Sequence, residues 1–466
     1  MKKATLLLAM LIAISGACLA QAQSPGDRLK QSRAVEAVIW GMPVVNYELM
    51  RQEMLTKTKA RVGEVVYWGR ALDWMNQTLT PNPDTIYFMT FFDTHDGPVV
   101  IEVPAADGSG SLNANIVTIW QMPLEDAGLL GIDKGAGGKF VILPPGYAGP
   151  SPAGTTPLQS DTFEGYALIR SNLRSHSDPD VAAAISYGKK LKVYPLSAAA
   201  NPPPTAFTDA RDVLFDSTIR FDSTFFENLN RVMQRDTWLE RDRAMIDQLR
   251  TLGIEKGKPY KPDGKTRNIL DAAAVEAKAW LDARYEAGWE VFYPGTNWRP
   301  GGVPELAKAM SARYAELDSY PLDWRGMIYT LGYIGIKRLG VGQFYLLTPK
   351  SKDGQSLDGA NTYRLTVPAN VPIDQYWSVT VYDRQTHALV RNMHRASRAS
   401  NSAEVQKNSD GSIDIYFGPK APSGKESNWV PTDPEREFEL MFRAYGPRQE
   451  FFQKKWALPD VVKFAG

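Results

Sequence analysis

Two polar side chains in the segment TPNPDTIYFMTFFD, residues 80–93, are placed where a rigid loop could present them to a ligand. Pro81 and Pro83 fix their φ angles at about −65°, and a residue before a proline is kept out of the helical region. Asn82 and Asp84 can also accept hydrogen bonds from the backbone of their own turns. The segment predicts a rigid loop before a strand, with Asn82 and Asp84 as candidate ligand-binding residues and a purely structural turn as the alternative.

Aromatic side chains form the second group of candidates. In YWSVTVYD, residues 376–383, strand alternation puts tyrosine, serine and threonine on one face and Trp377, Val379 and Val381 on the other. The first face is too polar for an ordinary core and suits the wall of a cleft. Tryptophans beside amides, as in Trp120-Gln121 and Asn428-Trp429, can stack on a ligand and orient it, although core packing is the alternative for each. The candidate ligand-binding residues are Asn82, Asp84, Tyr87, Trp120, Tyr376, Tyr382 and Trp429.

Motifs for metal or nucleotide cofactors are missing from the sequence. It contains no H-E-x-x-H, no G-x-S-x-G and no P-loop, and GAGGKF at 135–140 lacks the last glycine of a dinucleotide fingerprint. Of the four histidines, His387 and His394 lie seven residues apart on no evident shared face, so we predict no metal site, and we predict no cofactor. Carboxylate acid–base chemistry depends on separations in space, so the sequence leaves open whether the protein is an enzyme.

The elements that position these residues are mainly short strands bounded by Gly, Pro, Asp or Asn. Helical periodicity covers residues 29–57, where Pro43 predicts a kink or two shorter helices, and returns between 224 and 317. Strands are predicted at 86–92, 98–105, 115–122, 139–145, 165–173, 190–196, 342–349, 361–368, 375–383, 387–392, 412–419 and 438–447.

This pattern predicts an α+β protein that is mostly β. We expect two antiparallel β domains, each a sandwich or barrel, with a helical insert between them. The expected boundaries are a β-rich N-terminal domain with a leading helix at 23–200, the insert at 201–332, and the C-terminal β domain at 333–466.

The first 22 residues are typical of a secretory signal peptide. Lys2 and Lys3 precede a short apolar core, and Ala20-Gln21-Ala22 is a small-x-small cleavage site. Lipidation of Cys18 is the alternative. Cleavage removes the only cysteine and leaves 51 basic and 52 acidic residues, a formal charge of −1. The mature chain would be cysteine-free and periplasmic or secreted, and its balanced charge argues against nucleic acid as a partner. No later run is long enough for a membrane span.

Several segments together resemble a two-domain family whose halves are the domains of unknown function 1254 and 1214. These segments are WGMPVVNYELM, TPNPDTIYFMTFFDTHDGPVVIEVP, YWSVTVYDRQTHALV, NSDGSIDIYFGPKAPSGKESNWVPT and FRAYGPRQEFFQKKW. The resemblance implies two β domains with helices between them, the C-terminal one similar to a jelly roll. It implies no reaction.

The hypothesis that follows is an exported protein that binds, and in one version transforms, a small organic or carbohydrate-like molecule. The alternative is a non-catalytic envelope or assembly protein whose loops are only structural. Self-association is left open. A deep pocket lined by Asp84, Tyr87 and the strand of Tyr376 would favour the first hypothesis.

Overall fold

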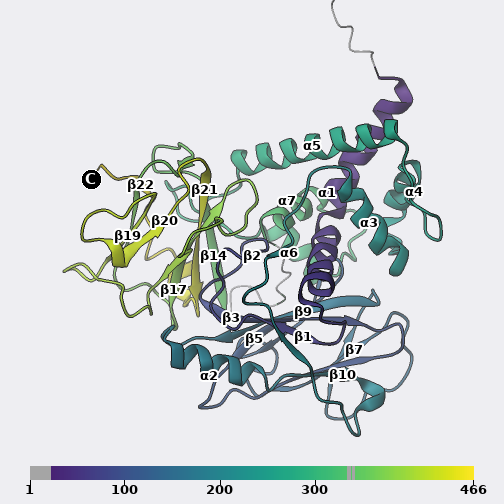
Figure 1. Ribbon diagram of the computed structural model, residues 1–466, viewed down its shortest axis with the longest axis horizontal. Helices are drawn as coiled ribbons and strands as arrows, with labels where there is room; N and C mark the ends of the chain where they lie inside the picture. Colours follow the sequence, from purple (N-terminus) through teal and green to yellow (C-terminus); the bar gives the residue numbers. More distant parts are fainter. Residues whose placement is uncertain (1–22, 333–336, 338–341, 466) are drawn as a thin grey trace, which may run out of the picture.

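The computed structural model describes residues 23–332, 337 and 342–465, and the predicted signal peptide, residues 1–22, lies outside the described residues. The described chain is a mixed α+β structure with eight α-helices and many antiparallel strands (Figure 1). The overall class predicted from the sequence is therefore confirmed.

Two sheets form the N-terminal half. The first has the strand order β11-β1-β3-β9-β5-β6, and all its neighbours are antiparallel except β1 and β11. Its strands are β1 (Val65–Tyr67), β3 (Thr85–Asp93), β5 (Leu112–Thr118), β6 (Pro123–Gly128), β9 (Glu164–Asn172) and β11 (Phe207–Asp209). The second sheet contains β4 (Val99–Val103), β7 (Gly138–Leu143), β8 (Thr156–Gln159) and β10 (Lys192–Pro195) in the order β10-β4-β7-β8.

Strand β3 is buried on both faces. Ile86, Phe88 and Phe92 belong to the core between the two sheets. The alternate residues, which include Tyr87 and Met89, belong to the core that the helices cover. The predicted alternation is confirmed, and neither face of the strand meets solvent because helices cover the second one.

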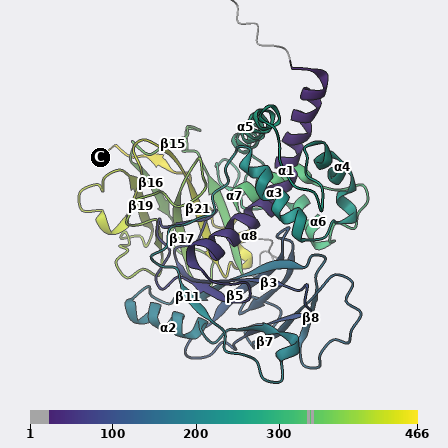
Figure 2. The same cartoon turned by 45° about the vertical axis from the view of Figure 1, so that its right-hand side comes forward.

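The covering layer is built around α1 (Pro25–Glu53), which runs across the first sheet (Figure 2). It contacts α3 (Thr224–Arg235), α4 (Arg243–Thr251), α5 (Gly264–Ala287) and α7 (Leu322–Leu331). The short helix α6 (Pro304–Ser311) precedes α7, while α2 (Asp178–Gly188) contacts β3 and β9.

Helix α1 continues through Pro43 as one helix, so the predicted division into two helices is wrong. Proline removes an amide donor to the carbonyl four residues earlier, here Ile39. Gly326 of α7 packs at this carbonyl, and an added Cβ there would lie 2.8 Å from the Ile39 oxygen. The close packing of α7 supports the helix where the proline weakens it.

The C-terminal half also has two sheets around one core. The first has the order β13-β14-β21-β17-β18, with β15 also paired to β21, and the second has the order β20-β19-β16-β22. The bounds are β13 (Arg299–Pro300), β14 (Gln343–Thr348), β15 (Leu357–Asp358), β16 (Tyr363–Val367), β17 (Trp377–Asp383), β18 (Ser397–Ala399), β19 (Ile413–Gly418), β20 (Trp429–Pro431), β21 (Glu437–Tyr445) and β22 (Val462–Lys463).

The predicted faces of β17 are confirmed. Trp377, Val379 and Val381 belong to the C-terminal core. The opposite face does not line an open cleft, since Tyr382 is fully buried and Tyr376 is 8% exposed. This polar face packs against the loop that precedes β3, so the two halves of the chain meet there.

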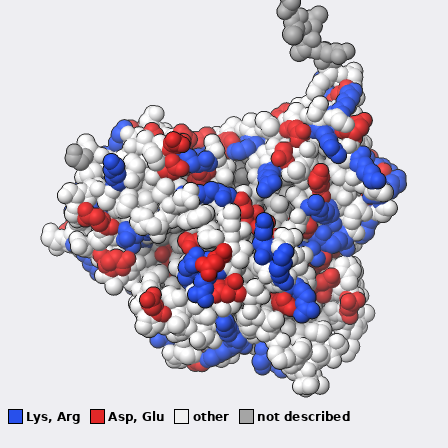
Figure 3. Space-filling model, viewed as in Figure 1, with Lys and Arg blue, Asp and Glu red and all other residues white. Residues whose placement is uncertain are grey.

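The surface seen in Figure 3 carries Lys and Arg side chains interspersed with Asp and Glu, without a large area of one sign. Within the described ranges, we find no helix whose length and apolar character would suffice to cross a membrane.

Candidate functional site

The loop Thr80–Asp84 lies between β2 (Asn76–Gln77) and β3 and is held by side chains of the C-terminal half. Tyr382 donates its hydroxyl to the Pro81 carbonyl at 2.6 Å, and Arg443 Nη2 donates to the Thr80 carbonyl at 3.0 Å. These donors come from β17 and β21 respectively. The loop is therefore part of a seam between the two halves of the chain.

Both polar atoms of the Asn82 side chain make hydrogen bonds. Its Oδ1 accepts from the Asp84 amide at 3.0 Å, which is the predicted turn. Its Nδ2 donates to the Tyr445 hydroxyl at 2.5 Å, and its own amide donates to the Tyr87 hydroxyl at 3.1 Å. Asn82 is thus a bridge between the turn and β21.

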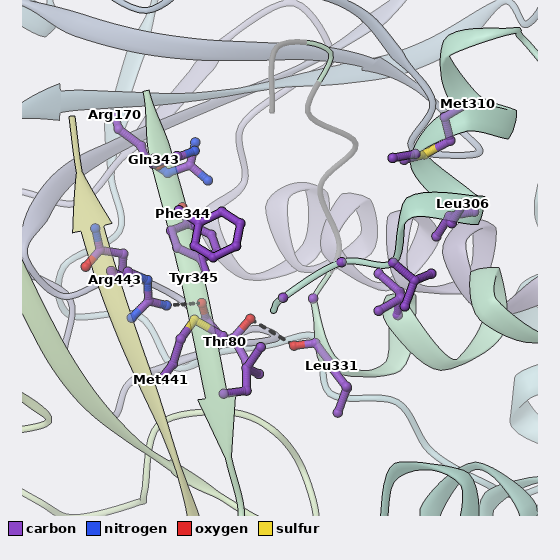
Figure 4. Close-up of a pocket in the computed structure, with 18 of the residues that line it drawn as sticks. Thr80, Arg170, Leu306, Met310, Leu331, Gln343, Phe344, Tyr345, Met441 and Arg443 are labelled. Carbon is purple, nitrogen blue, oxygen red and sulfur yellow. Dashed lines mark hydrogen bonds between the residues drawn. The ribbon is translucent and has the colours of Figure 1, made fainter. Parts of the chain in front are cut away.

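On one side of the loop lies a cavity of about 130 Å³, here called the seam cavity (Figure 4). It is bounded by the loop and β3/β9 of the N-terminal half, by α6 and α7, and by β14 and β21. The polar wall contains Thr80, Asn82, Tyr87, Arg170, Tyr345 and Arg443. The apolar wall includes Val303, Leu306, Met310, Ile328, Leu331 and Met441.

Arg443 is the most buried charge on the polar wall, with 1% of its surface exposed. It donates to Thr380 Oγ1 at 2.8 Å, to the Thr80 carbonyl and to the Tyr382 hydroxyl. Burial opposes its charge, but the surrounding phenol groups outweigh this and raise the pKa of Arg443 above its ordinary value. Its Nε–H has no hydrogen-bond partner among the described residues. Arg443 therefore lines the cavity as a permanent cation that has one donor unused among the described residues.

Arg170 of β9 adds a second cation to the same wall. Its Nη1 donates to Asn115 Oδ1 at 2.7 Å, and its Nε lies 3.3 Å from the Tyr87 hydroxyl. The guanidinium also lies over the Tyr87 ring, 5.4 Å from the centroid. Figure 4 shows Arg170, Tyr345 and Arg443 along the strands, with Leu306 and Met310 on the opposite, helical side.

On the other side of the loop lies a larger depression of about 850 Å³, here called the polar groove. Its walls come from α2, from the loop after β1 and from residues 394–404. Asp84 Oδ2 accepts from Ser397 Oγ at 2.8 Å, and Asp84 Oδ1 lies 3.7 Å from His176 Nε2. The carboxylate of Asp84 thus points to partners distant in sequence, and only Asn82 makes the expected side-chain bond within the turn.

The five candidate residues other than the two tryptophans fall into three groups. Asn82 and Tyr87 line the seam cavity, whereas Asp84 lines the polar groove. Tyr376 and Tyr382 line neither space. They donate to the carbonyls of Asp84, at 3.2 Å, and of Pro81, and so fix the loop.

The two tryptophans lie elsewhere. Trp120 packs on Trp40 with ring centroids 4.6 Å apart, under the guanidinium of Arg325. Trp429 donates its indole N–H to the Gly418 carbonyl at 2.8 Å and lies near His394. Both tryptophans therefore support local packing away from the loop.

Sequence reasoning missed Arg170, Arg443 and the apolar wall. In the predicted strand 438–447, alternation puts Arg443 on the same face as Glu439 and Met441, opposite the face of Leu440 and Phe442. An arginine within a predicted strand was the feature of the sequence that could have indicated a buried cation. What it faces depends on contacts with the loop more than 360 positions away.

The seam cavity suits a small amphipathic molecule. Its polar wall offers guanidinium and phenol groups to an acceptor, while its apolar wall offers aliphatic and thioether contacts. Within the described part of the chain, we find no cluster of three or more His, Cys, Asp or Glu residues able to hold a metal ion.

Comparisons with known proteins agree with the architecture. A family model described as "Protein of unknown function (DUF1254)" matches residues 62–195, and one described as "Protein of unknown function (DUF1214)" matches residues 342–449. The resemblance recognised from the sequence is thereby confirmed. The loop lies within the first matched region, and β17 and β21 lie within the second. No curated protein matches the chain.

Two solved structures are similar. The VPA0106 protein from Vibrio parahaemolyticus is 18% identical with a TM-score of 0.58, over 94% of this chain and 100% of that chain. This likeness shows a shared fold. An uncharacterized protein from Burkholderia cenocepacia is 13% identical with a TM-score of 0.42, over 94% and 95% of the two chains.

Proposed function

Because the chain belongs to the two-domain family of unknown function that these two models represent, we propose its activity from the site alone: the protein binds a small organic acid in the seam cavity. The ligand has a carboxylate that meets Arg443 and Arg170, and a compact apolar body that meets α6 and α7.

The observation that carries this proposal is the state of Arg443. A guanidinium that is 1% exposed and retains a donor without a partner among the described residues leaves a buried polar group unsatisfied, which costs free energy. A carboxylate in the cavity would remove this cost with a charge-assisted hydrogen bond. The three hydrogen-bond partners of Arg443 given above are a hydroxyl of threonine, a backbone carbonyl and a hydroxyl of tyrosine, and none of them is a carboxylate.

Size limits the class of acid. The cavity volume of about 130 Å³ is close to that of apolar cavities of roughly 150 Å³ that hold benzene. An aromatic or branched aliphatic carboxylic acid therefore fits. A sugar fits less well, because its hydroxyl groups would face Leu306, Met310 and Ile328 without partners.

The test is a thermal-shift and calorimetric titration with benzoate and isobutyrate, compared with benzamide and glucose. A ligand that binds only the folded state raises the melting temperature by mass action, and we expect the two acids to do so more than the neutral compounds. A protein that responds to none of the acids, as expected for a structural envelope protein, overturns the proposal.

A cavity-filling variant tests whether benzoate raises the melting temperature by binding in the seam cavity. Leu306→Trp adds bulk to the apolar wall and should abolish the response to benzoate while leaving Arg443 intact. Val275→Trp on the exposed side of α5 is the matched control, since Val275 is 61% exposed and far from the cavity lining. Equal responses in both variants would exclude the seam cavity as the site.

The finer features expected from the sequence belong to the same proposal. We propose that the protein acts in the periplasm or outside the cell after cleavage near Gln23, that its C-terminal half is jelly-roll-like, and that residues 201–332 form an insert. The apolar segment before Ala22 supports export. Intact mass of the exported protein tests it, and an acylated Cys18 would contradict it.

A further inference from the structure

The polar groove contains a second arginine with unused donors. Arg398 lies in β18, the edge strand of its sheet, and is 4% exposed. Its Nη1 donates to Glu404 Oε1 at 2.9 Å, whereas its Nε and Nη2 have no hydrogen-bond partner among the described residues. Both unused donors belong to a residue that lines the groove.

The two unused donors have a defined geometry. The N–H bonds of Nε and Nη2 point in parallel from one edge of the planar guanidinium, and this edge matches two oxygens of a carboxylate or phosphate. Glu404 occupies only the other end of the group, and its side chain is 54% exposed, so its pair with Arg398 is weakly stabilising. Within the described part of the chain, both donors of this edge are buried and have no partner, so an oxyanion that reaches them would satisfy both.

Two arginines lie close together at this end of the groove. Burial and the nearby Arg395 lower the pKa of Arg398 to about 10, although Glu404 and Asp84 act in the opposite direction. Burial lowers the pKa of Arg395 as well. Both side chains remain cationic at neutral pH, and an anion bound by Arg398 would add to the compensation that these two carboxylates provide.

His176 supplies a further group at the groove. Both of its ring nitrogens are buried and have no hydrogen-bond partner among the described residues, and Nε2 lies 3.7 Å from Asp84 Oδ1. Its backbone is in the left-handed region, with φ of 63°. Asp180 Oδ2 accepts from three successive amides here, at 2.7, 2.8 and 3.2 Å, which fixes the segment. The imidazole is thus placed by a rigid turn.

Two other arginines of the groove, Arg70 and Arg211, are already paired with carboxylates. Arg211 Nε donates to Asp209 at 2.8 Å, and Arg70 pairs with Asp73 and Asp212 at 2.9 Å each. These pairs lie at more exposed positions than Arg398. The groove therefore combines paired cations at its outer part with an unpaired donor edge at a buried position.

We propose that the polar groove is a second ligand site, which binds an oxyanion group in bidentate fashion on the Nε/Nη2 edge of Arg398, with His176 as an additional donor. Asp84 lies beside the imidazole, 3.7 Å from its Nε2, and is itself held by Ser397. The site is separate from the seam cavity, and the loop Thr80–Asp84 forms the wall between them.

Two anions distinguish a phosphorylated ligand from a carboxylic acid. Inorganic phosphate and acetate are titrated into the full-length protein by calorimetry, with chloride at equal ionic strength as the control. Preferential binding of phosphate identifies a phosphorylated ligand, and preferential binding of acetate identifies a carboxylic acid. If neither anion binds more tightly than chloride, the proposal is overturned.

Variants assign the binding to Arg398. Arg398→Lys keeps the charge but removes the planar fork, and it should weaken anion binding by about tenfold or more, the loss of one bidentate contact. Arg243→Lys is the matched control and should change affinity by less than about twofold, because the side chain of Arg243 is 78% exposed, pairs with Glu240 and lies outside the groove lining. Equal effects of the two substitutions would overturn the assignment.

A substitution at the surface avoids the risk of misfolding. Glu404→Gln removes the carboxylate that competes for Arg398 and should strengthen anion binding, while a weaker or unchanged affinity contradicts the proposal. Leu306→Trp, which fills the seam cavity, should leave phosphate binding unchanged. Failure of the seam-cavity proposal and failure of this one therefore give different results.

Discussion

Arg443 and Arg398 lie on opposite sides of the loop Thr80–Asp84, and both are almost completely buried. Arg443 makes three hydrogen bonds to neutral groups and lies 5.3 Å from the centroid of the Tyr345 ring. Arg398 makes a single bond, to a half-exposed carboxylate.

This difference separates two uses of a buried cation. Arg443 joins three segments, so most of its donors hold the two halves of the chain together and one remains for a ligand. Arg398 holds little of the surrounding structure, and a whole donor edge remains. The number of structural bonds that a buried arginine makes should therefore predict how much stability its removal costs.

The largest expected effect lies in the core that supports both sides of the loop. Trp377 is 3% exposed and stacks on Phe442 with centroids 5.7 Å apart. Trp377→Ala should lower the free energy of unfolding by about 3–5 kcal/mol, the usual cost of deleting a large buried aromatic side chain. Urea denaturation measures it. Trp377→Phe should cost less, and equal losses for the two would argue against a packing role.

The direct test of the comparison is a pair of identical substitutions. Arg443→Met leaves Thr80, Thr380 and Tyr382 without a donor and should lower the free energy of unfolding by about 3 kcal/mol. Arg398→Met removes a buried cation with one half-exposed partner and should cost at most about 1 kcal/mol. Similar losses in the two variants would remove the distinction.

A smaller effect is expected at Asp84, which belongs to the groove side alone. Asp84→Asn keeps an oxygen for Ser397 but loses the charge beside His176, and the cost should be about 1 kcal/mol. Binding of benzoate in the seam cavity should not change. A double-mutant cycle with His176→Gln isolates the contribution of the pair, and a coupling of zero would show that the two groups act independently.

The smallest effect is expected at Tyr376. Its hydroxyl donates to the Asp84 carbonyl at 3.2 Å, and Tyr376→Phe removes only this bond. The free energy of unfolding should fall by at most about 1 kcal/mol. Since Tyr376 lines neither space, both ligand responses should persist, and loss of either response with retained stability would show that the hydroxyl contacts a ligand.

The sequence predicts the strands of the fold because their side chains alternate. Alternation in β3, β17 and β21 assigns each residue to its face. It places Trp377 in the C-terminal core and Arg443 on the face of the sheet that points away from that core. Short or turn-bound elements escape this reasoning. Strand β18 has three residues and no pattern to detect.

The strand predicted at 387–392 is wrong for a physical reason. Asp383 Oδ1 accepts the amides of Gln385 and Thr386, and the Asp383 carbonyl accepts the amide of His387. These bonds close a turn, and His387 itself is in the left-handed region with φ of 55°. A local carboxylate thus overrides the apolar pattern of the segment.

The candidate site was predicted only in part because its partners are distant in sequence. The loop could be recognised in the sequence because its two prolines restrict the backbone, and Asn82 makes the expected turn. The residues that face the loop, from β17, β18 and β21, follow from tertiary packing alone. For the same reason, the sequence placed Asp84 with Tyr87, although the loop separates their side chains into two spaces.

The bond between Asn82 and Tyr445 spans 363 positions, and this span has a consequence for synthesis of the chain. At 5–20 residues per second, Tyr445 follows Asn82 from the ribosome after roughly 20–70 s. The core between the two N-terminal sheets is complete in sequence at Phe207 and β17 ends at Asp383, so the bonds from β21 are the last ones that the loop can form. A nascent chain interrupted before β21 therefore contains the residues of its first two sheets and of the polar groove, but it lacks Met441 and Arg443 of the seam cavity.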